Sequence, residues 1–273
     1  MGSVNKRAFE IRGYNDAPIR GDIFDNSEGE RKPVVVFCHG FKGFKDWGPW
    51  SSMATELAKA GLVVVTFNFS HNGVGEDLEN FTELDKFRAN TASIEQGDLR
   101  CVVNSLKDIL PASADTSSVG LVGHSRGGPP AVVVGAEDAR VKKVATLAGV
   151  ADPKRFTEEQ VIEWREKGVI HILNSRTGQQ LPLGIELLED IENNPDFVEQ
   201  SARKLNKPLL VIHGDKDPVV DVSEAKMLES WAEKSSLKII PGADHTFGAK
   251  HPYKEPSKDF DLVVRLLKVF FCG

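Results

Sequence analysis

Six short apolar runs recur along the chain, and none of them alternates with polar residues. They are "PVVVFCH" (33–39), "LVVVTFNF" (62–69), "SVGLVG" (118–123), "KVATLAG" (143–149), "PLLVIHG" (208–214) and "LKIIPG" (237–242). A strand without alternation is covered on both faces, which is typical of a parallel sheet between two layers of helices. The runs therefore predict one largely parallel sheet that extends through most of the chain.

Segments with helical periodicity separate these runs. They cover residues 50–61, 93–110, 129–139, 221–234 and 257–270. Strands that alternate with helices along a chain predict a doubly wound α/β fold. Near the start, "FEIRG" and "APIRGDIF" alternate in polarity and predict an antiparallel hairpin.

Residues 151–204 interrupt this rhythm, because they separate two predicted core strands by far more than one crossover helix requires. They read as a helix, a hairpin that turns at Ser175–Gly178, and further helix. We expect an inserted lid here, with residues 1–150 and 205–273 forming the core. Ligands bind at the carboxyl ends of strands in open α/β sheets, which favours a lid over that edge. The alternative is an excursion elsewhere on the surface.

The stretch "LVGHSRGG" follows a predicted buried strand and precedes a predicted helix. Its G-x-S-x-G pattern is weak by itself, but the strand–turn–helix context is the one that a nucleophile elbow needs. Gly123 and Gly127 would allow the tight turn, and Ser125 would present its hydroxyl above the sheet. Ser125 is therefore the candidate nucleophile.

A serine hydroxyl needs a base, and the base needs an orienting acid; in such a fold both follow later strands, acid first. Asp217 follows "PLLVIHG" and His245 follows "LKIIPG", so they are the candidate acid and base. Asp215 competes with Asp217, although its position suits capping the turn. His251 competes with His245, but it precedes the last helix instead of following a strand.

The developing oxyanion needs two backbone donors. We expect them to be the N–H groups of Arg126, directly after the nucleophile, and of Phe41 in "HGFKGFKDWG". Gly40 would let that loop approach closely, and His39 is expected to brace it. This reading needs no cofactor and no metal, and the histidines and cysteines show no zinc-ligand spacing.

The inserted segment supplies apolar side chains that we expect either to line a substrate pocket or to form the insert's own core. They are Trp164, Ile170, Ile172, Leu173, Leu181, Leu183, Ile185 and Leu187. Among them Leu173 and Leu181 are candidate substrate contacts, together with His171. Arg176 would bind a polar or anionic substituent or form a solvated hairpin tip.

Composition limits the partners. The net charge of −6 and scattered basic residues argue against nucleic acid, and no apolar run reaches the ~18 residues of a membrane span. Three widely spaced cysteines and the absence of an apolar signal core in residues 1–13 predict a cytoplasmic protein. The candidate nucleophile, acid and base predict a small-molecule ester as its partner. Monomer and homodimer both remain open.

The motifs "HGFKGFK", "GHSRGG", "HGDKDPVV" and "GADHTF" resemble those of the α/β-hydrolase superfamily, and most resemble its cinnamoyl/feruloyl esterase group. The elbow is also similar to that of chlorophyllase-like and dienelactone-hydrolase-like enzymes. The resemblance implies an α/β-hydrolase fold and a serine carboxylesterase, with Ser125, Asp217 and His245 as the triad. Arg126 departs from the esterase group, in which Gln more often follows the nucleophile. A peptidase, amidase or thioesterase with the same triad and a non-catalytic binding protein are the alternatives.

Overall fold

The computed structural model describes residues 3–26 and 31–273, so the first two residues of the segment considered for a signal peptide lie outside it. A single sheet of eight strands forms the centre, in the order β1-β2-β4-β3-β5-β6-β9-β10. The strands are β1 (Asn5–Arg12), β2 (Pro18–Asp25), β3 (Lys32–Cys38), β4 (Val63–Phe67), β5 (Ala114–His124), β6 (Val141–Leu147), β9 (Leu209–Gly214) and β10 (Ser235–Ile240).

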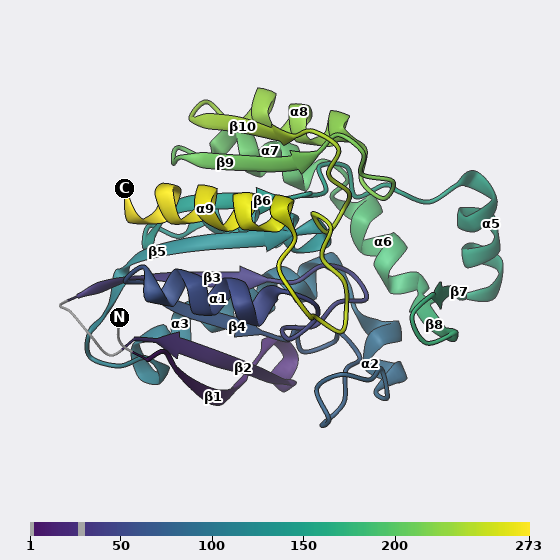
Figure 1. Ribbon diagram of the computed structural model, residues 1–273. Coiled ribbons are helices and arrows are strands. Elements are labelled where there is room, and N and C mark those ends of the chain that lie inside the picture. Colours follow the sequence, from purple (N-terminus) through teal and green to yellow (C-terminus); the bar gives the residue numbers. More distant parts are fainter. Residues whose placement is uncertain (1–2, 27–30) are drawn as a thin grey trace.

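Strand directions confirm the predicted fold class. All neighbours from β4 to β10 pair in parallel, whereas β1 pairs with β2, and β2 with β4, in antiparallel register. The six apolar runs are the six parallel strands, and the alternating segments near the start form the predicted hairpin. The chain is therefore a doubly wound α/β protein with an N-terminal antiparallel pair (Figure 1).

Helices cover both faces of the sheet. Helices α1 (Trp50–Lys59) and α9 (Lys258–Cys272) pack on the face toward the viewer in Figure 1. The opposite face is covered by α3 (Ala92–Ile109), α4 (Gly128–Glu137), α7 (Phe197–Lys204) and α8 (Val222–Trp231). Two apolar cores result, one on each side of the strands.

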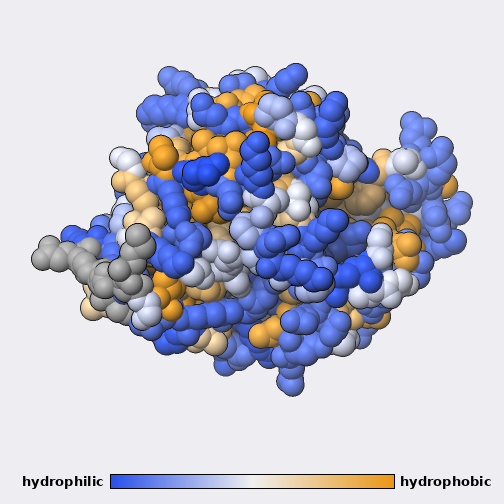
Figure 2. All heavy atoms as spheres, viewed as in Figure 1, coloured by the Kyte–Doolittle hydropathy of each residue, from blue (hydrophilic) through white to orange (hydrophobic). Residues whose placement is uncertain are grey.

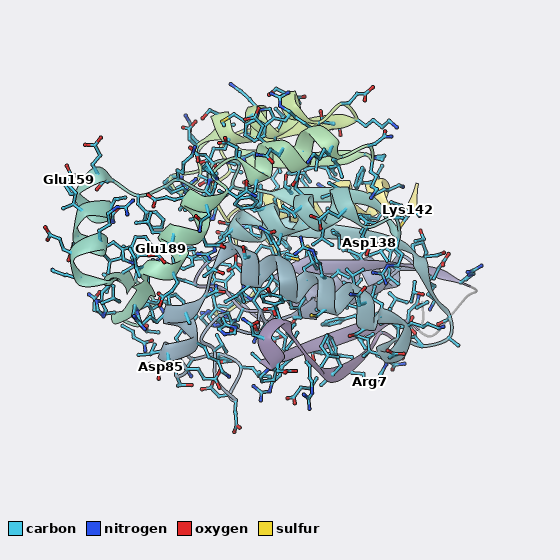
Figure 3. The ribbon with its side chains drawn as sticks, turned by 180° about the vertical axis from the view of Figure 1, so that it is seen from behind. Arg7, Asp85, Asp138, Lys142, Glu159 and Glu189 are labelled. Atoms are coloured by element: carbon cyan, nitrogen blue, oxygen red, sulfur yellow. The ribbon has the colours of Figure 1, made fainter. Side chains whose placement is uncertain are left out.

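A separate arm extends between β6 and β9. It contains α5 (Glu158–Lys167), a hairpin of β7 (Val169–Asn174) and β8 (Gln179–Gly184), and α6 (Ile185–Asn193). The arm lies on the side toward which the parallel strands point (Figure 1), and hydrophobic residues gather where it meets the main body (Figure 2). Seen from behind, Glu159 and Glu189 mark its two helices (Figure 3).

The final part of the predicted insert behaves differently. The sequence reads as one helix to residue 205, but the structure breaks it between Asn193 and Phe197, around Pro195, because a proline disfavours helix at the preceding residue. Side chains of α7 then pack into the main core with α4. The predicted insert, residues 151–204, thus includes one helix, α7, that packs with the core.

The spacing of Asp221 and Glu224 predicts a capping box on α8, and only half of it forms. The Asp221 side chain accepts from the N–H of Ser223, as a helix cap does. Glu224 instead accepts from the N–H groups of Ala151 and Asp152, at 2.8 and 3.2 Å. Glu224 therefore anchors the start of the insert. No helix within the described residues is long and apolar enough to cross a membrane.

Candidate active site

The elbow after β5 is sterically demanding. Ser125 has a φ of +53°, in the left-handed region that side chains rarely adopt. A Cβ at Gly123 would lie 2.2 Å from the carbonyl oxygen of Gly127, and one at Gly127 would lie 2.3 Å from that of Cys38. Only glycine fits at both positions. The tight turn places Ser125 at the end of β5, just before α4.

The structure brings Ser125, His245 and Asp217 together. With its Nδ1 protonated, His245 donates to Asp217 Oδ2 across 2.8 Å, and its Nε2 lies 3.0 Å from Ser125 Oγ, within reach of the hydroxyl proton. The three side chains come from loops after three different parallel strands. Parallel strands end at one edge of the sheet, which is why residues so distant in sequence meet there.

The Asp217 carboxylate is fully buried and surrounded by donors. Its Oδ1 accepts from the N–H groups of Val219 and Val220 at 2.8 and 2.9 Å. Burial alone would raise the pKa of Asp217, but hydrogen bonds from His213, His245 and Val220 outweigh it and hold the pKa well below its usual range. The group is therefore a carboxylate throughout the physiological range.

His213 on β9 is a neighbour of Asp217 that sequence reasoning missed. Its ring is completely buried, and its Nε2 lies 2.9 Å from the Val220 carbonyl oxygen and 3.3 Å from Asp217 Oδ2. The sequence feature that could have identified it is a histidine inside an otherwise apolar strand. A buried imidazole ring needs a polar partner, and Asp217 is a nearby candidate. His213 and His245 therefore both contact Oδ2 of the Asp217 carboxylate.

The rival candidates have other partners. Asp215 accepts from the N–H of Gly242 at 2.7 Å, across the turn after β10, as a capping residue does. His251 accepts at Nδ1 from the N–H of Gly48 at 3.0 Å and stacks on Trp47. Neither makes a hydrogen bond to Ser125 or to the ring of His245 within the part of the chain that the structure describes.

Two further histidines support the loops. His124, directly before Ser125, bonds through Nε2 to the His245 carbonyl oxygen at 3.1 Å. Burial and the neighbouring His245 lower the pKa of His124 to about 3, and burial lowers that of His39 to about 4, so both rings are neutral. His39 donates through Nδ1 to the Gly40 carbonyl oxygen and accepts from the N–H of Phe69, which braces the loop after β3.

This loop passes very close to the elbow. A Cβ at Gly40 would lie 2.9 Å from the Cβ of Ser125, so glycine is required for the approach. Within residues 3–26 and 31–273, neither the N–H of Phe41 nor that of Arg126 is donated to a protein acceptor. Both amides therefore remain able to donate to another group beside Ser125.

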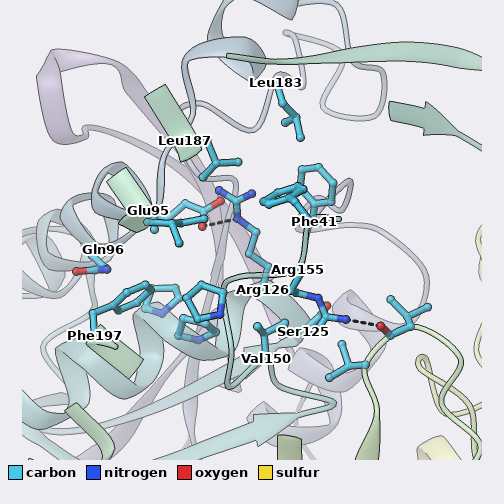
Figure 4. A pocket seen from close by; sticks show the side chains of 18 residues that line it. Phe41, Glu95, Gln96, Ser125, Arg126, Val150, Arg155, Leu183, Leu187 and Phe197 are labelled. Carbon is cyan, nitrogen blue, oxygen red and sulfur yellow. Dashed lines mark hydrogen bonds and ion pairs between the residues drawn. The ribbon is translucent and has the colours of Figure 1, made fainter. Parts of the chain in front are cut away.

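A cavity of about 240 Å³ opens beside Ser125 (Figure 4). Most of its wall is apolar, and the apolar side chains come from both the core and the arm. They include Phe41, Pro129, Pro130, Val150, Phe156, Leu183, Leu187, Ile191, Phe197, Val219 and Val220. Arg126 and Glu95 add a polar pair, in which Arg126 Nε donates to Glu95 Oε2 at 2.9 Å.

The expected contacts from the arm are placed elsewhere. His171 and Leu173 lie on the exposed face of the hairpin, and Leu181 is fully buried in the arm's own core. None of the three lines this cavity, whereas Leu183 and Leu187 do. Alternation along β7 turns His171 and Leu173 to the exposed face. Leu181 shares the buried face of β8 with Leu183 but lies within the arm's own core.

A second cavity, of about 210 Å³, is also lined by Ser125 and is more polar. Its lining includes His245, Lys42, Ser175 and Arg176, together with Phe41 of the loop after β3. Among the described residues no group of three or more His, Cys, Asp or Glu side chains is arranged to hold a metal ion.

The strand order and helix layers are those of the α/β-hydrolase fold. The sequence matches the dienelactone hydrolase family over residues 20–270, and the chain belongs to that family. No curated protein matches the sequence.

Solved structures share the fold at low identity. The esterase domain of a Rhodothermus marinus protein is 20% identical with a TM-score of 0.66, and the alignment covers 97% of both chains. Est1E from Butyrivibrio proteoclasticus, also solved with bound ferulic acid, is 18% identical with a TM-score of 0.70 over 97% of both chains. Dienelactone hydrolase from Anabaena variabilis is 18% identical with a TM-score of 0.64, over 99% of this chain and 98% of that one.

Proposed function

We propose that the protein is a serine carboxylesterase that hydrolyses small to medium esters through an acyl-enzyme. The observation that carries the proposal is the pair of contacts at His245, 3.0 Å to Ser125 Oγ and 2.8 Å to Asp217 Oδ2. A base within hydrogen-bond distance of the hydroxyl, itself oriented by a carboxylate, is the arrangement that activates serine.

The reaction has two steps. His245 takes the proton of Ser125 as its oxygen attacks the ester carbonyl, and the N–H groups of Phe41 and Arg126 stabilise the oxyanion. His245 then gives the proton to the departing alcohol, and water, deprotonated by the same ring, releases the acid. Asp217 holds the ring with Nδ1 protonated and stabilises the imidazolium.

The acyl group of the substrate would occupy the apolar cavity, and an aromatic acid suits its walls. Phe41, Phe156 and Phe197 line this space, and Arg126 provides a polar edge. Ferulic acid bound to Est1E, a structure of the same fold, supports a cinnamoyl or feruloyl ester as the substrate class. Within the predicted insert 151–204, the arm from α5 to α6 would act as the lid that closes the cavity.

A fluorophosphonate probe and a panel of esters test the proposal. We expect the probe to label Ser125 in the folded protein, and we expect Ser125→Ala to lose both labelling and ester turnover. Absence of labelling in the folded wild type would instead indicate a binding protein on a hydrolase scaffold. Turnover of a p-nitrophenyl acyl ester, an acyl thioester and an aminoacyl anilide, compared under the same conditions, separates an esterase from a thioesterase or an amidase.

A further inference from the structure

The two cavities beside Ser125 differ in chemistry. Ser125 and Phe41 line both, so the cavities meet at the nucleophile. The first has mainly apolar walls, and its two arginines, Arg126 and Arg155, are each paired with a glutamate. The second contains Lys42 and Arg176, and no aspartate or glutamate belongs to its described lining.

The position of His245 decides which part of an ester enters which cavity. This step rests on the proposed function, in which His245 gives its proton to the leaving oxygen. His245 lines the second cavity and not the first. The alcohol part of the substrate must therefore lie in the second cavity, and the acyl part in the first.

The two cations of the second cavity lack carboxylate partners. Within residues 3–26 and 31–273, no aspartate or glutamate oxygen lies within 4.0 Å of Lys42 Nζ or of the Arg176 guanidinium. Their protein acceptors are backbone carbonyl oxygens, that of Leu173 for Lys42 at 3.1 Å and that of Glu79 for Arg176 at 3.2 Å. Two positive charges beside one cavity, neither in an ion pair with a carboxylate of the described residues, favour an anion there.

Lys42 is half-buried and Arg176 is exposed at the hairpin tip, and each makes defined contacts. The Asn174 side chain accepts from the N–H of Arg176 at 3.2 Å, which shapes the hairpin tip, and the guanidinium lies 5.8 Å from the centre of the Phe44 ring. The bond from Lys42 to Leu173 joins the oxyanion loop to the same hairpin. Half-burial lowers the pKa of Lys42, and an anion beside it would raise that pKa again.

We propose that the second cavity binds a leaving alcohol that carries a carboxylate, which Lys42 and Arg176 pair with on the side where His245 releases it. The natural substrate is then an ester of an apolar acid with a hydroxy acid. Arg176 and Lys42 are specificity residues in this assignment, since they contact the leaving part and leave the reacting atoms to the triad.

Two benzoyl esters with the same acyl group test the assignment, one with 4-hydroxybenzoate and one with its neutral analogue 4-hydroxybenzamide as the leaving group. We expect kcat/KM to be at least about tenfold higher for the anionic ester at low ionic strength, and the ratio to fall as salt screens the charges. Arg176→Gln and Lys42→Gln should each lower the ratio several-fold. Arg165→Gln is the matched control, because Arg165 pairs with Glu192 on the arm and lines neither cavity.

The outcomes separate this inference from the function on which it rests. Turnover of both esters with a ratio near one, or a ratio that neither variant changes, overturns the carboxylate subsite and leaves the esterase intact. Absence of turnover of both benzoyl esters and of a p-nitrophenyl ester, with Ser125 unlabelled by fluorophosphonate, overturns both.

Discussion

Arg126 donates through Nε to Glu95 Oε2 across 2.9 Å, and both side chains line the cavity beside Ser125. The second oxygen of Glu95 accepts from Asn90 Nδ2 at 2.8 Å. The side chains are only 19% and 9% exposed, so neither charge is well hydrated. The charges of Arg126 and Glu95 compensate each other beside the cavity, so each side chain depends on its partner.

Removing one member of the Arg126–Glu95 pair should cost more folding stability than removing both. We expect Glu95→Gln to lower the free energy of unfolding by about 3 kcal/mol, because it leaves the Arg126 cation buried and unpaired. The double variant Glu95→Gln/Arg126→Gln should recover at least half of that loss in urea unfolding. Breaking the exposed Arg165–Glu192 pair is the control and should cost less than about 1 kcal/mol. Additive effects of the two substitutions would contradict the coupling.

The two carboxylates after β9 give a sharp comparison. Asp217→Asn should lower kcat by about 10⁴, because the amide can no longer hold His245 in the tautomer that accepts from Ser125. Asp215→Asn should leave kcat nearly unchanged, since that side chain bonds only the turn at Gly242 among the described residues. Steady-state kinetics on one ester checks both. The reverse ranking would assign the orienting role to Asp215.

Adjacent leucines on α6 separate substrate contact from stability. Leu187 lines the apolar cavity, whereas Leu188 is equally buried in the arm's core but does not line it. Each change to alanine should cost about 2–5 kcal/mol of folding stability. Only Leu187→Ala should shift the preference toward larger acyl groups in a series of p-nitrophenyl esters. An equal shift in Leu188→Ala would show that the arm acts through its general rigidity.

The parallel strands and the elbow could be predicted because their signals are local. Continuous apolar runs mark strands covered on both faces, and Gly123 is required by a contact within the elbow itself, with the Gly127 carbonyl oxygen. The meeting of Ser125, Asp217 and His245 then follows from topology, since all three loops leave the same edge of the sheet. Their catalytic roles stay predictions.

The cavity wall contributed by the arm could not be predicted in the same way. Leu181 and Leu183 are equivalent in sequence, and which of them borders the cavity depends on how β8 packs against α2 (Leu84–Ala89) and the buried ring of Phe81. That segment carries no strong periodic signal. The place of Glu95 in the cavity wall could not be predicted for a related reason. Its charge on a buried helix face is stabilised by Arg126, and the sequence does not show that these two distant residues meet.

Asp98 links the pH dependence of stability to the loop that follows β4. Its side chain is fully buried and accepts from the N–H groups of Ser70 and Tyr14 at 2.7 and 2.9 Å. Burial raises the pKa of Asp98 to about 6 despite these bonds, so the folded state binds its proton more tightly than the unfolded state does.

The stabilising contribution of Asp98 is therefore fully present below about pH 4 and is lost as the pH rises through about 6. Between pH 7 and pH 4.5, we expect the wild type to gain about 2 kcal/mol in unfolding free energy relative to Asp98→Asn, which cannot take up this proton. Urea unfolding of both proteins at the two pH values measures the difference, and other titrating groups cancel in the comparison. The opposite result is a difference in unfolding free energy that does not change with pH, or a wild type that loses stability relative to Asp98→Asn at the lower pH. Either result would mean that the two backbone donors dominate over burial at Asp98.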